Sequence, residues 1–464
     1  MYEKTKRLGA LLLVVVMIFS LAACKKSNDD TSSDYIEYVT EYEYVTEEGE
    51  EAEGEEGTTS GGKKTSSGKK TSSGGKTSVD FGGTKADVSA LKGTTVRYAI
   101  WADHNKDVIN DFVENTGINV KIDNVSQADY TNTVASKVAS ASNDYPGPDI
   151  FFCNNFFPWC ITAIQPINAM NLDLSDPIWD QGIIEFSTIK GKPYFINTVG
   201  NFWTEVDCLY FNKNVLKRAG VPESMYPDKQ VAAGTWTWDA MGLIMKQVKE
   251  QLGEGYYGGY LDYGAMIASA GVQYDTFKNG KYTNGINSHA IDVNVKLAEW
   301  YTAGYVKGYG MTYRDDFISG KTAIAVTHAY GLKANGYWKS MNPDHLGFTY
   351  LPDFSSTVKM RTGGMLRGWG LCKGASNPEG AGLFLRYYLD VNNYDTGSLF
   401  LNSAAETFFF KLTSGVDTGD KVLHQDAPNC YANCTPDQVA PAMQAVMGEN
   451  RYDSWNELIS KNTQ

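Results

Sequence analysis

The stretch after the first two dozen residues most limits what this chain can fold into, because it cannot build a core. From Lys25 to about Lys85 the sequence consists mainly of Gly, Ser, Thr, Lys and Glu. It begins acidic, with Glu-Tyr-Val-Thr-Glu occurring twice, and turns basic, with Lys-Lys-Thr-Ser-Ser-Gly occurring twice. Few apolar side chains and many charges cannot offset the entropy lost on ordering. We therefore expect residues 24–87 to be a disordered tether and the fold to begin near residue 88.

As a flexible coil, a tether of this length would span about 40–45 Å root mean square. Such a reach suits a domain held at a distance from a membrane within a cell wall. The two charge blocks are also compatible with a binding tail, but opposite blocks in one segment are more typical of a solvated spacer.

The start of the chain is typical of a secretory signal. Lys4, Lys6 and Arg7 precede an apolar run from Leu8 to Ala23. Small residues then lead into Cys24. A basic start, a short apolar core and a small-residue end predict a signal peptide over residues 1–23. The run is slightly short for a membrane-spanning helix, although an uncleaved anchor is the alternative.

Leu21-Ala22-Ala23-Cys24 resembles a bacterial lipobox, which implies that Cys24 is acylated and becomes the mature N-terminus. We then expect a lipid-anchored protein on the extracellular face of the cell membrane of a Gram-positive bacterium.

Length and composition limit the folded part. About 375 residues remain after the tether, which is more than one core usually holds, so two lobes are expected. All ten Trp lie in this part, and aromatic residues make up 13% of the chain, which favours a surface that stacks on flat ligands. A net charge of -13 argues against a nucleic-acid partner.

Six cysteines remain besides Cys24. Cys153 and Cys160 are seven positions apart, and Cys430 and Cys434 are four apart. Disulfides and free thiols both stay open for these pairs. No His stands at ligand spacing to either pair, so we expect no metal. We also expect no other cofactor.

Periodicity and turn residues predict an α/β fold. Residues 94–101, 118–122 and 148–152 have the character of strands, and residues 108–116 and 130–141 between them have helical spacing. Strand–helix–strand units of this length predict a parallel sheet. Further along, the same criteria predict an extended segment over 194–212, helices over 238–252, 289–301 and 378–388, and strands over 346–351 and 365–372.

The order of short motifs resembles the extracellular solute-binding proteins of the maltose-binding type, the lipoprotein receptors of ABC importers. Trp101-Ala102-Asp103-His104, Gly147-Pro148-Asp149-Ile150 and Gly368-Trp369-Gly370 are three of the segments that carry the resemblance. The others are residues 112–120, 190–194, 209–216, 219–222, 237–239, 317–324, 351–353 and 376–379. The resemblance covers residues 88 to about 389.

This resemblance implies two α/β lobes joined by hinge segments, with the solute in the cleft between them. Lobe one would hold residues 88–202 with 346–385, and lobe two residues 203–345 with 386–464. It also implies a monomer that closes over a small-molecule solute, most often a sugar, and delivers it to the transmembrane subunits of an ABC permease.

The hinge segment contains the most specific local pattern. Side chains alternate along an extended chain, so Trp203, Glu205 and Asp207 share one face. An indole can stack on the C–H face of a sugar ring while carboxylates accept hydrogen bonds from its hydroxyls, and charge-assisted bonds are about twice as strong as neutral ones. The resemblance also places an acidic ligand residue at Glu205. The alternative is a Trp packed at the lobe junction and carboxylates that face water.

The resemblance adds other candidate ligand contacts. Asp103 and His104 follow the first strand, at a carboxyl end where α/β sheets bind ligands. Tyr330 stands where the family has a stacking Trp, and His328 before it replaces a small residue, which is a departure from the pattern. Trp159 and Trp369 complete the predicted site, with buried packing as the alternative for Trp369.

We found no catalytic motif: a Gly-x-Ser-x-Gly elbow, a His-Glu-x-x-His pair and a phosphate loop are all missing from the sequence. Glu205 and Asp207 sit side by side on one strand and do not flank a scissile bond. We therefore expect a receptor and not an enzyme, with a surface-anchored glycoside hydrolase and a ligand sensor for a membrane kinase as alternatives.

Overall fold

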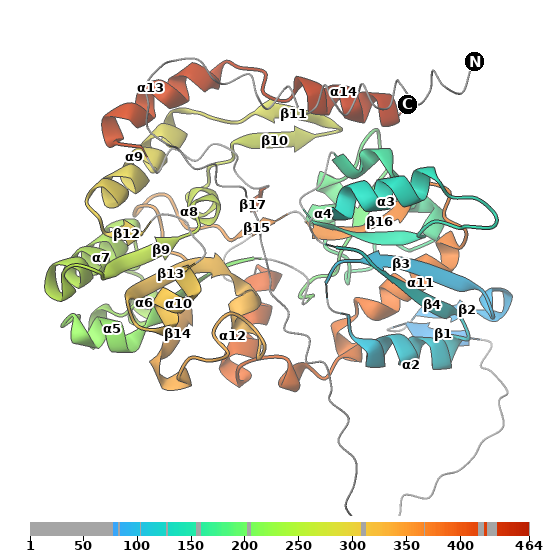
Figure 1. The fold of residues 1–464 in the computed structure, drawn as a ribbon, viewed down its shortest axis with the longest axis horizontal. Helices are drawn as coiled ribbons and strands as arrows, with labels where there is room; N and C mark the ends of the chain where they lie inside the picture. The colour runs from blue at the N-terminus through green and yellow to red at the C-terminus, as the bar shows by residue number, and fades with distance from the viewer. Residues whose placement is uncertain are drawn as a thin grey trace, which may run out of the picture. The chain divides into compact units, whose positions relative to one another are not determined.

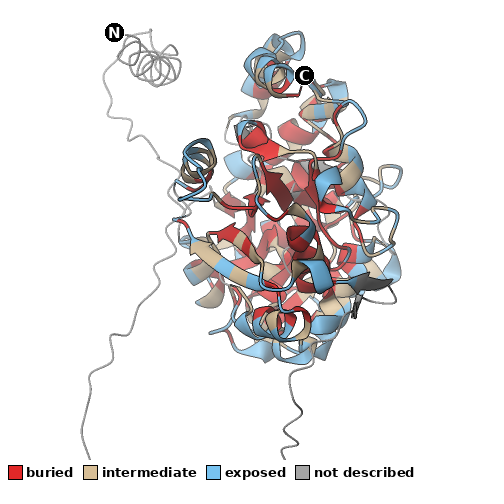
Figure 2. Cartoon of the chain, turned by 90° about the vertical axis from the view of Figure 1, so that its right-hand side faces the viewer, coloured by how far each residue is buried: buried red, intermediate tan, exposed pale blue. Residues whose placement is uncertain are grey.

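The structure of the chain is a computed structural model that describes residues 78–81, 84–102, 104–126, 129–154, 159–201, 206–307, 312–365, 367–415, 422–424 and 434–463. Two larger β-sheets, each with helices packed against it, organise this part of the chain (Figure 1). Buried residues gather in the strands and on the inner faces of the helices (Figure 2).

The first sheet has the strand order β4-β3-β5-β16-β6, and β7 pairs with β16 beside this path. β3 runs parallel to β4 and β5, which confirms the expected strand–helix–strand units, whereas β16 is antiparallel to β5, β6 and β7. The strands are β3 (Thr95–Ile100), β4 (Asn119–Asn124), β5 (Ile150–Asn154), β6 (Ile164–Gln165), β7 (Phe195–Ile196) and β16 (Arg367–Cys372).

Helices cover this first sheet: α2 (Lys106–Thr116), α3 (Tyr130–Ala139), α4 (Gln181–Phe186) and α11 (Pro378–Tyr388). α2 begins after Asn105, whose side chain accepts hydrogen bonds from the next turn, and ends at Gly117 with φ 72°. Tyr98 and Ile100 of β3 pack into one core cluster and Ala99 between them into another, so the strand alternation buries both faces.

The second sheet has the order β12-β9-β13-β8-β14. β8 runs antiparallel to β13 and β14, while β13 and β12 run parallel to β9. The strands are β8 (Asp207–Asn212), β9 (Tyr257–Leu261), β12 (Val306–Lys307), β13 (Thr322–His328) and β14 (Leu346–Thr349). Residues 346–349 therefore belong to the second sheet, although the sequence-based division placed them with the first lobe.

Helices pack on both faces of this second sheet. Leu209 and Phe211 of β8 face one core cluster, and Cys208 and Tyr210 face another. α7 (Trp238–Leu252) covers the residues predicted for it and begins after Thr237, whose hydroxyl accepts from the N–H of Ala240. The remaining helices are α5 (Lys213–Arg218), α6 (Pro227–Ala233), α8 (Tyr263–Ser269), α9 (Ser288–Thr302), α10 (Tyr313–Ile318), α12 (Ser403–Ser414) and α13 (Pro436–Met447).

The chain passes between the two sheets after β7, between β14 and β16, and after α11. The first two of these segments meet, since Val206 forms an antiparallel bridge with Gly364. Beside them, β15 (Gly363–Met365) pairs in parallel with β17 (Val422–His424). This meeting point lies directly before β8.

Residues 78–87 differ from the expected tether, because β1 (Ser78–Phe81) and β2 (Thr84–Asp87) form an antiparallel hairpin that contacts α2. The pairing brings Phe81 opposite Thr84. In the sequence a Gly-Gly pair separates the two strands, which is a known hairpin signal. The low apolar content of the preceding residues hid this hairpin from an analysis based on composition. The hairpin is held by backbone hydrogen bonds between its strands, which composition does not reveal.

The C-terminal helix α14 (Asp453–Asn462) contacts the hairpin of β10 (Asp275–Lys278) and β11 (Lys281–Asn284) and also η2, which follows the first sheet's β5. Asn456 accepts from the Tyr282 N–H at 2.7 Å and donates to its carbonyl at 3.0 Å. The predicted division counted this helix with the second lobe. Short 3₁₀ turns are η1 (Ser89–Leu91), η2 (Trp159–Thr162), η3 (Ile167–Met170), η4 (Glu223–Met225), η5 (Ala329–Leu332), η6 (Pro343–His345), η7 (Val391–Asn393) and η8 (Thr396–Ser398).

Candidate ligand-binding site

Two polar side chains meet where β8 begins and β13 ends. The antiparallel register pairs Asp207, the first residue of β8, with His328, the last residue of β13. The His328 Nδ1 atom lies 3.3 Å from an Asp207 carboxylate oxygen. The Asp207 side chain is fully buried, while 17% of the His328 side chain is exposed. The imidazole is therefore the member of the pair that reaches toward solvent.

The backbone of the second crossing segment packs closely against this carboxylate. A Cβ atom at Gly363 would overlap a carboxylate oxygen of Asp207, so only glycine fits there. The bridge between Val206 and Gly364 holds the two segments in this register. On the other side, the Ala329 N–H donates to the Val206 carbonyl at 2.8 Å. Asp207 is thus fixed among three stretches of chain.

Tyr330 follows directly in η5 and is half-buried. Its ring centroid lies 5.1 Å from that of Tyr337, and the Arg314 guanidinium lies 4.1 Å from the Tyr337 ring centroid. The Lys333 ammonium lies 5.3 Å from the Tyr330 ring centroid, and the Tyr330 hydroxyl donates to the Asn335 carbonyl at 3.5 Å. These contacts orient the Tyr330 ring beside the Lys333 ammonium and the Tyr337 ring.

Buried aromatic residues pack against η5 (Ala329–Leu332). The Tyr210 hydroxyl donates to the His328 carbonyl at 3.0 Å, and its ring packs edge-on against Trp338 at 5.2 Å between centroids. Gly331 lies so close to both side chains that a Cβ atom would meet them. The turn after β13 therefore needs glycine at this position, and the close packing sets where Tyr330 lies.

Of the predicted site, the structure places Asp207 beside His328, two residues before Tyr330, and it adds Gly331 and Gly363 as positions of close packing. The sequence noted His328 only as a departure from the family pattern. Its place at a strand end was a usable signal, but its partner was set by strand register. The two glycines gave no sequence signal, because their role depends on close approach across the chain.

The other predicted contacts are distributed differently. Trp203, Glu205 and Asp103 lie outside the described residues. His104 is half-buried and stands directly before Asn105, the N-cap of α2, at the carboxyl end of β3. Trp159 is the first residue of η2.

Trp369 is a core residue in this structure, which corresponds to the packing alternative. It is 0% exposed, its indole N–H donates to the Tyr98 hydroxyl at 2.8 Å, and its ring packs on Phe152 at 4.7 Å between centroids. Burial raises the pKa of Tyr98 well above its ordinary value. Flanking glycines let β7 approach, since a Cβ at Gly368 would press on the Ile196 carbonyl. The glycines serve sheet packing here.

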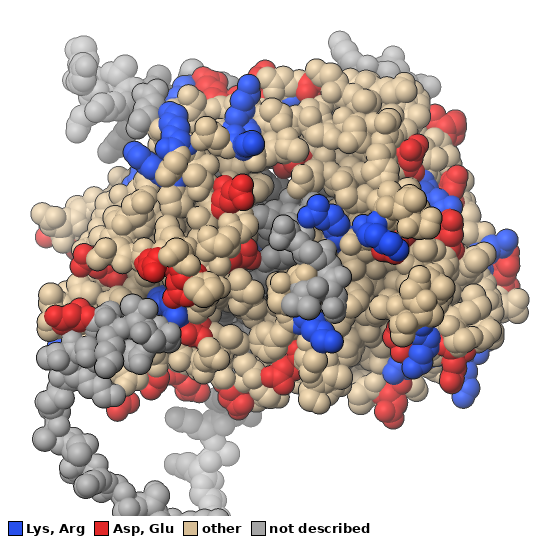
Figure 3. Space-filling view, turned by 180° about the vertical axis from the view of Figure 1, so that it is seen from behind, with Lys and Arg blue, Asp and Glu red and all other residues tan. Residues whose placement is uncertain are grey.

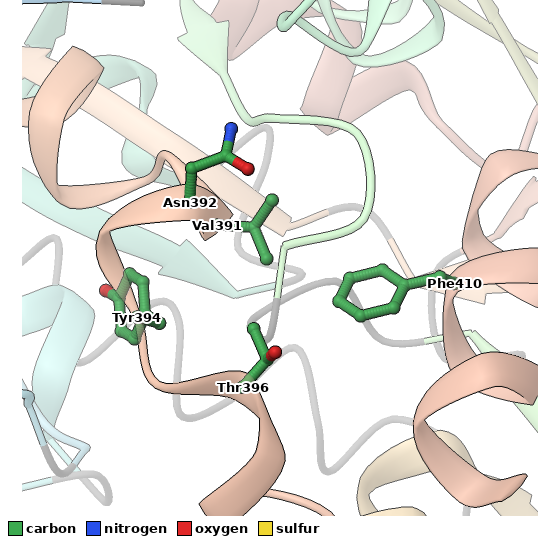
Figure 4. A pocket seen from close by; sticks show the side chains of 5 residues that line it. All are labelled: Val391, Asn392, Tyr394, Thr396 and Phe410. Carbon is green, nitrogen blue, oxygen red and sulfur yellow. The ribbon is translucent and has the colours of Figure 1, made fainter. Parts of the chain in front are cut away.

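A pocket of about 430 Å³ lies at the residues that lead from α11 to α12 (Figure 4). Phe410 of α12 points across it toward Val391 and Thr396, and Asn392 and Tyr394 complete the lining. The Tyr394 hydroxyl donates to the Tyr388 carbonyl at 2.6 Å. Among the described lining residues, none belongs to the sequence-predicted site.

Three further features of the molecule are its surface charge, the hydropathy of its helices and the arrangement of possible metal ligands. On the face shown in Figure 3, Lys and Arg are interspersed with Asp and Glu. In the part of the chain that the structure describes, no helix has the length and apolar character needed to cross a bilayer. Within the same residues, no group of three or more His, Cys, Asp or Glu is arranged to hold a metal ion.

Comparison with solved structures supports the two-lobed α/β fold. A binding protein for cyclic alpha-maltosyl-1,6-maltose from Arthrobacter globiformis is 16% identical, with a TM-score of 0.56 over 80% of this chain and 97% of its own. An extracellular solute-binding protein from Staphylococcus aureus in complex with maltose is 17% identical, with a TM-score of 0.53 over 80% and 96%. The sugar-binding protein MalE of Xanthomonas citri is 15% identical, with a TM-score of 0.54 over 79% and 96%.

These likenesses concern the fold, since the identities are low. No curated protein matches the chain. The family model described as bacterial extracellular solute-binding protein matches residues 90–391, which is more than half of the chain. The match includes both sheets and the group of Asp207, His328 and Tyr330, so this chain belongs to the bacterial extracellular solute-binding proteins.

Proposed function

We propose that this chain is the solute receptor of an ABC importer and that it binds an oligosaccharide between its two lobes. The observation that carries the proposal is the pairing of Asp207 with His328 at one end of the second sheet, with Tyr330 in the turn that follows. That end adjoins the crossing segment, in which Trp203 and Glu205 precede Val206 in the sequence.

The chemistry of this group suits a sugar. A tyrosine ring offers a flat face to the C–H groups of a pyranose, and an imidazole donates to or accepts from hydroxyls. Asp207 is fully buried and lies beside His328, so in this proposal it acts on the ligand through the imidazole. Trp203 would add a second stacking face and Glu205 a charged acceptor. Asp103 and His104 would add polar contacts from the first lobe.

The solved relatives support an oligosaccharide as the solute class. Besides the maltose complex, a Listeria monocytogenes substrate-binding protein was solved with cycloalternan, at 14% identity and a TM-score of 0.50. A Bifidobacterium longum protein was solved with lacto-N-biose, at 14% identity and a TM-score of 0.52. These ligands are all short or cyclic saccharides, and the fold of this chain is the one that holds them.

We further propose that the protein is anchored outside the cell through a lipid on Cys24, acts as a monomer, and delivers its solute to a membrane permease. The Cys24→Ala variant should lose fatty-acid label and leave the membrane fraction or accumulate as a precursor. Metabolic labelling followed by membrane fractionation checks this. Equal labelling of the variant and the wild type would show that Cys24 is not the anchor.

The solute class is tested by a thermal-shift screen followed by calorimetry with linear and cyclic glucans, galactose-containing disaccharides and peptides. A solute that binds only the folded state adds about 2.7 kcal/mol of stability at one hundred times its dissociation constant. We expect a saccharide to give such a shift, and we expect Trp203→Ala and Glu205→Gln to weaken its binding.

The same samples separate binding from hydrolysis. After prolonged incubation the saccharide should be recovered intact by mass spectrometry. Shortened sugar products would favour a glycoside hydrolase, and a shift with peptides alone would contradict the proposed solute class.

A further inference from the structure

Two buried cysteines lie in contact at the end of the first sheet. Cys153 belongs to β5 and Cys160 to η2, and they are 1% and 0% exposed. Both are thiols in the structure, with their sulfur atoms 3.5 Å apart. The two residues are seven positions apart in the sequence, so contact between them joins a strand end to the turn that follows it.

We propose that Cys153 and Cys160 form a disulfide when the protein folds outside the cytoplasm. The sulfur atoms need to approach by about 1.5 Å to reach bonding distance, which is a small rearrangement for two neighbouring side chains. The chain belongs to an extracellular family, and such proteins meet conditions in which disulfides persist.

The other buried thiols show why this pair is distinct. Cys208 lies in a core cluster of the second sheet and donates to the carbonyl oxygens of Leu209 and Thr349, at 3.8 and 3.9 Å. Cys372 shares the cluster of Cys153 and Cys160, yet the sulfur contact joins only those two among the described residues. Oxidation is therefore expected at one pair and not at random among buried cysteines.

Burial determines when the bond forms. The pKa of the Cys160 thiol is raised well above its ordinary value, chiefly because burial disfavours the thiolate and further because of the adjacent Cys153. The thiolate is the attacking species, so the folded pair reacts slowly and oxidation belongs to the folding stage, when both sulfurs still meet solvent.

The exchange needs an oxidant, which we take to be a small-molecule disulfide or the disulfide form of an extracellular oxidoreductase. One cysteine thiolate attacks a sulfur of that disulfide, forms a mixed disulfide and releases one thiolate. The second cysteine then attacks its partner's sulfur, and the other half of the oxidant leaves. Two protein thiols lose their two protons and two electrons, and the oxidant becomes two thiols.

The bond would close a short loop and fix η2 to β5. η2 contacts both α3 and the C-terminal helix α14. A disulfide mainly restricts the unfolded chain, so it should raise the resistance of this part of the first lobe to unfolding.

Mass spectrometry on the full chain, secreted and handled without reductant, tests the proposal. No Lys or Arg lies between Lys137 and Lys190, so trypsin releases both cysteines in one peptide. With the disulfide present, the peptide lacks two hydrogens and takes up iodoacetamide only after reduction. The chain refolded with oxidised glutathione should give the same result.

Thermal unfolding provides the second readout. Reductant should lower the melting temperature of the wild type by about 5 °C, as expected for closure of a loop this short in a large domain. The Cys153→Ala/Cys160→Ala variant should not respond to reductant, whereas the matched control Cys208→Ala should respond like the wild type. If both cysteines are alkylated without reduction, even after refolding with oxidised glutathione, the proposal is wrong.

Discussion

At the scale of single residues, the three side chains of the candidate site differ in burial and position: they are Asp207, His328 and Tyr330. Asp207 is the buried member, His328 reaches solvent beside it, and Tyr330 presents a ring from the turn that follows. A carboxyl group held out of water needs a polar partner, and the strand register supplies the imidazole 3.3 Å away. The pairing of β8 with β13 therefore sets the position of the Asp207 carboxyl group beside His328.

Replacing Tyr330 with alanine should weaken solute binding because it removes a stacking face. We expect a loss of about 1–2 kcal/mol, or roughly a five- to thirty-fold higher dissociation constant. A binding isotherm with the best saccharide from the screen measures it. Tyr301→Ala is a matched control, since Tyr301 lies on α9 and is 37% exposed. Wild-type affinity for Tyr330→Ala would place the ligand elsewhere.

Gly363 should tolerate no side chain, because a Cβ atom would displace the Asp207 carboxylate from its place beside His328. We expect Gly363→Ala to destabilise the protein by about 1–3 kcal/mol, as overpacking does in other cores. Thermal unfolding checks this against Gly448→Ala, whose added methyl group meets nothing within 4 Å at a φ of -93°. Equal melting temperatures for the two variants would contradict the close approach.

At the scale of elements, one carboxylate joins three parts of the first sheet. Asp149 precedes β5 and is 0% exposed. It accepts from the Arg97 N–H of β3 at 2.8 Å, and from the N–H groups of Ser376 and Asn377 before α11 at 2.6 and 3.0 Å. The Gly-Pro-Asp-Ile motif that helped to suggest the family therefore has a structural role here. It ties a late helix to the early strands.

Asp149→Asn should destabilise the fold, since an amide replaces one accepting oxygen with a donor that faces another N–H. Hydrogen bonds to charged groups contribute more than neutral ones, and we expect a loss of about 2–4 kcal/mol. Thermal unfolding measures it. Asp129→Asn is the control, because the exposed Asp129 side chain makes no capping bond at the start of α3. A melting temperature no lower than that of the control would show that the hydrogen bonds accepted by Asp149 do not stabilise the fold.

At the scale of the whole molecule, the long polar segment and the folded part are expected to act independently. Deleting Lys25 to Thr77 should leave solute affinity unchanged, because that segment lacks a core-forming pattern and precedes the family match, which begins at residue 90. Calorimetry on the shortened and the full chain decides it. A tenfold loss of affinity would mean that the segment takes part in binding.

Much of the fold could be predicted from local pattern. The helices over Trp238–Leu252 and Pro378–Tyr388 begin and end at the predicted residues, and the first three strands of the first sheet lie where alternation and turn residues put them. The hairpin over residues 78–87 was missed because composition dominated that region. Of the candidate site, Asp207 lies beside His328, two residues before Tyr330, while Trp369 is packed in the core.

The sequence alone determined the α/β class, the order of most elements, the family and the candidate ligand residues, because those depend on neighbours a few positions apart. Tertiary structure decided which distant residues meet. His328 lies beside Asp207, and Gly363 approaches that carboxylate, only because strand register and crossing segments join positions more than one hundred residues apart. The same holds for Trp369 with Tyr98. Such pairings depend on packing and register across the whole fold, which local periodicity does not encode.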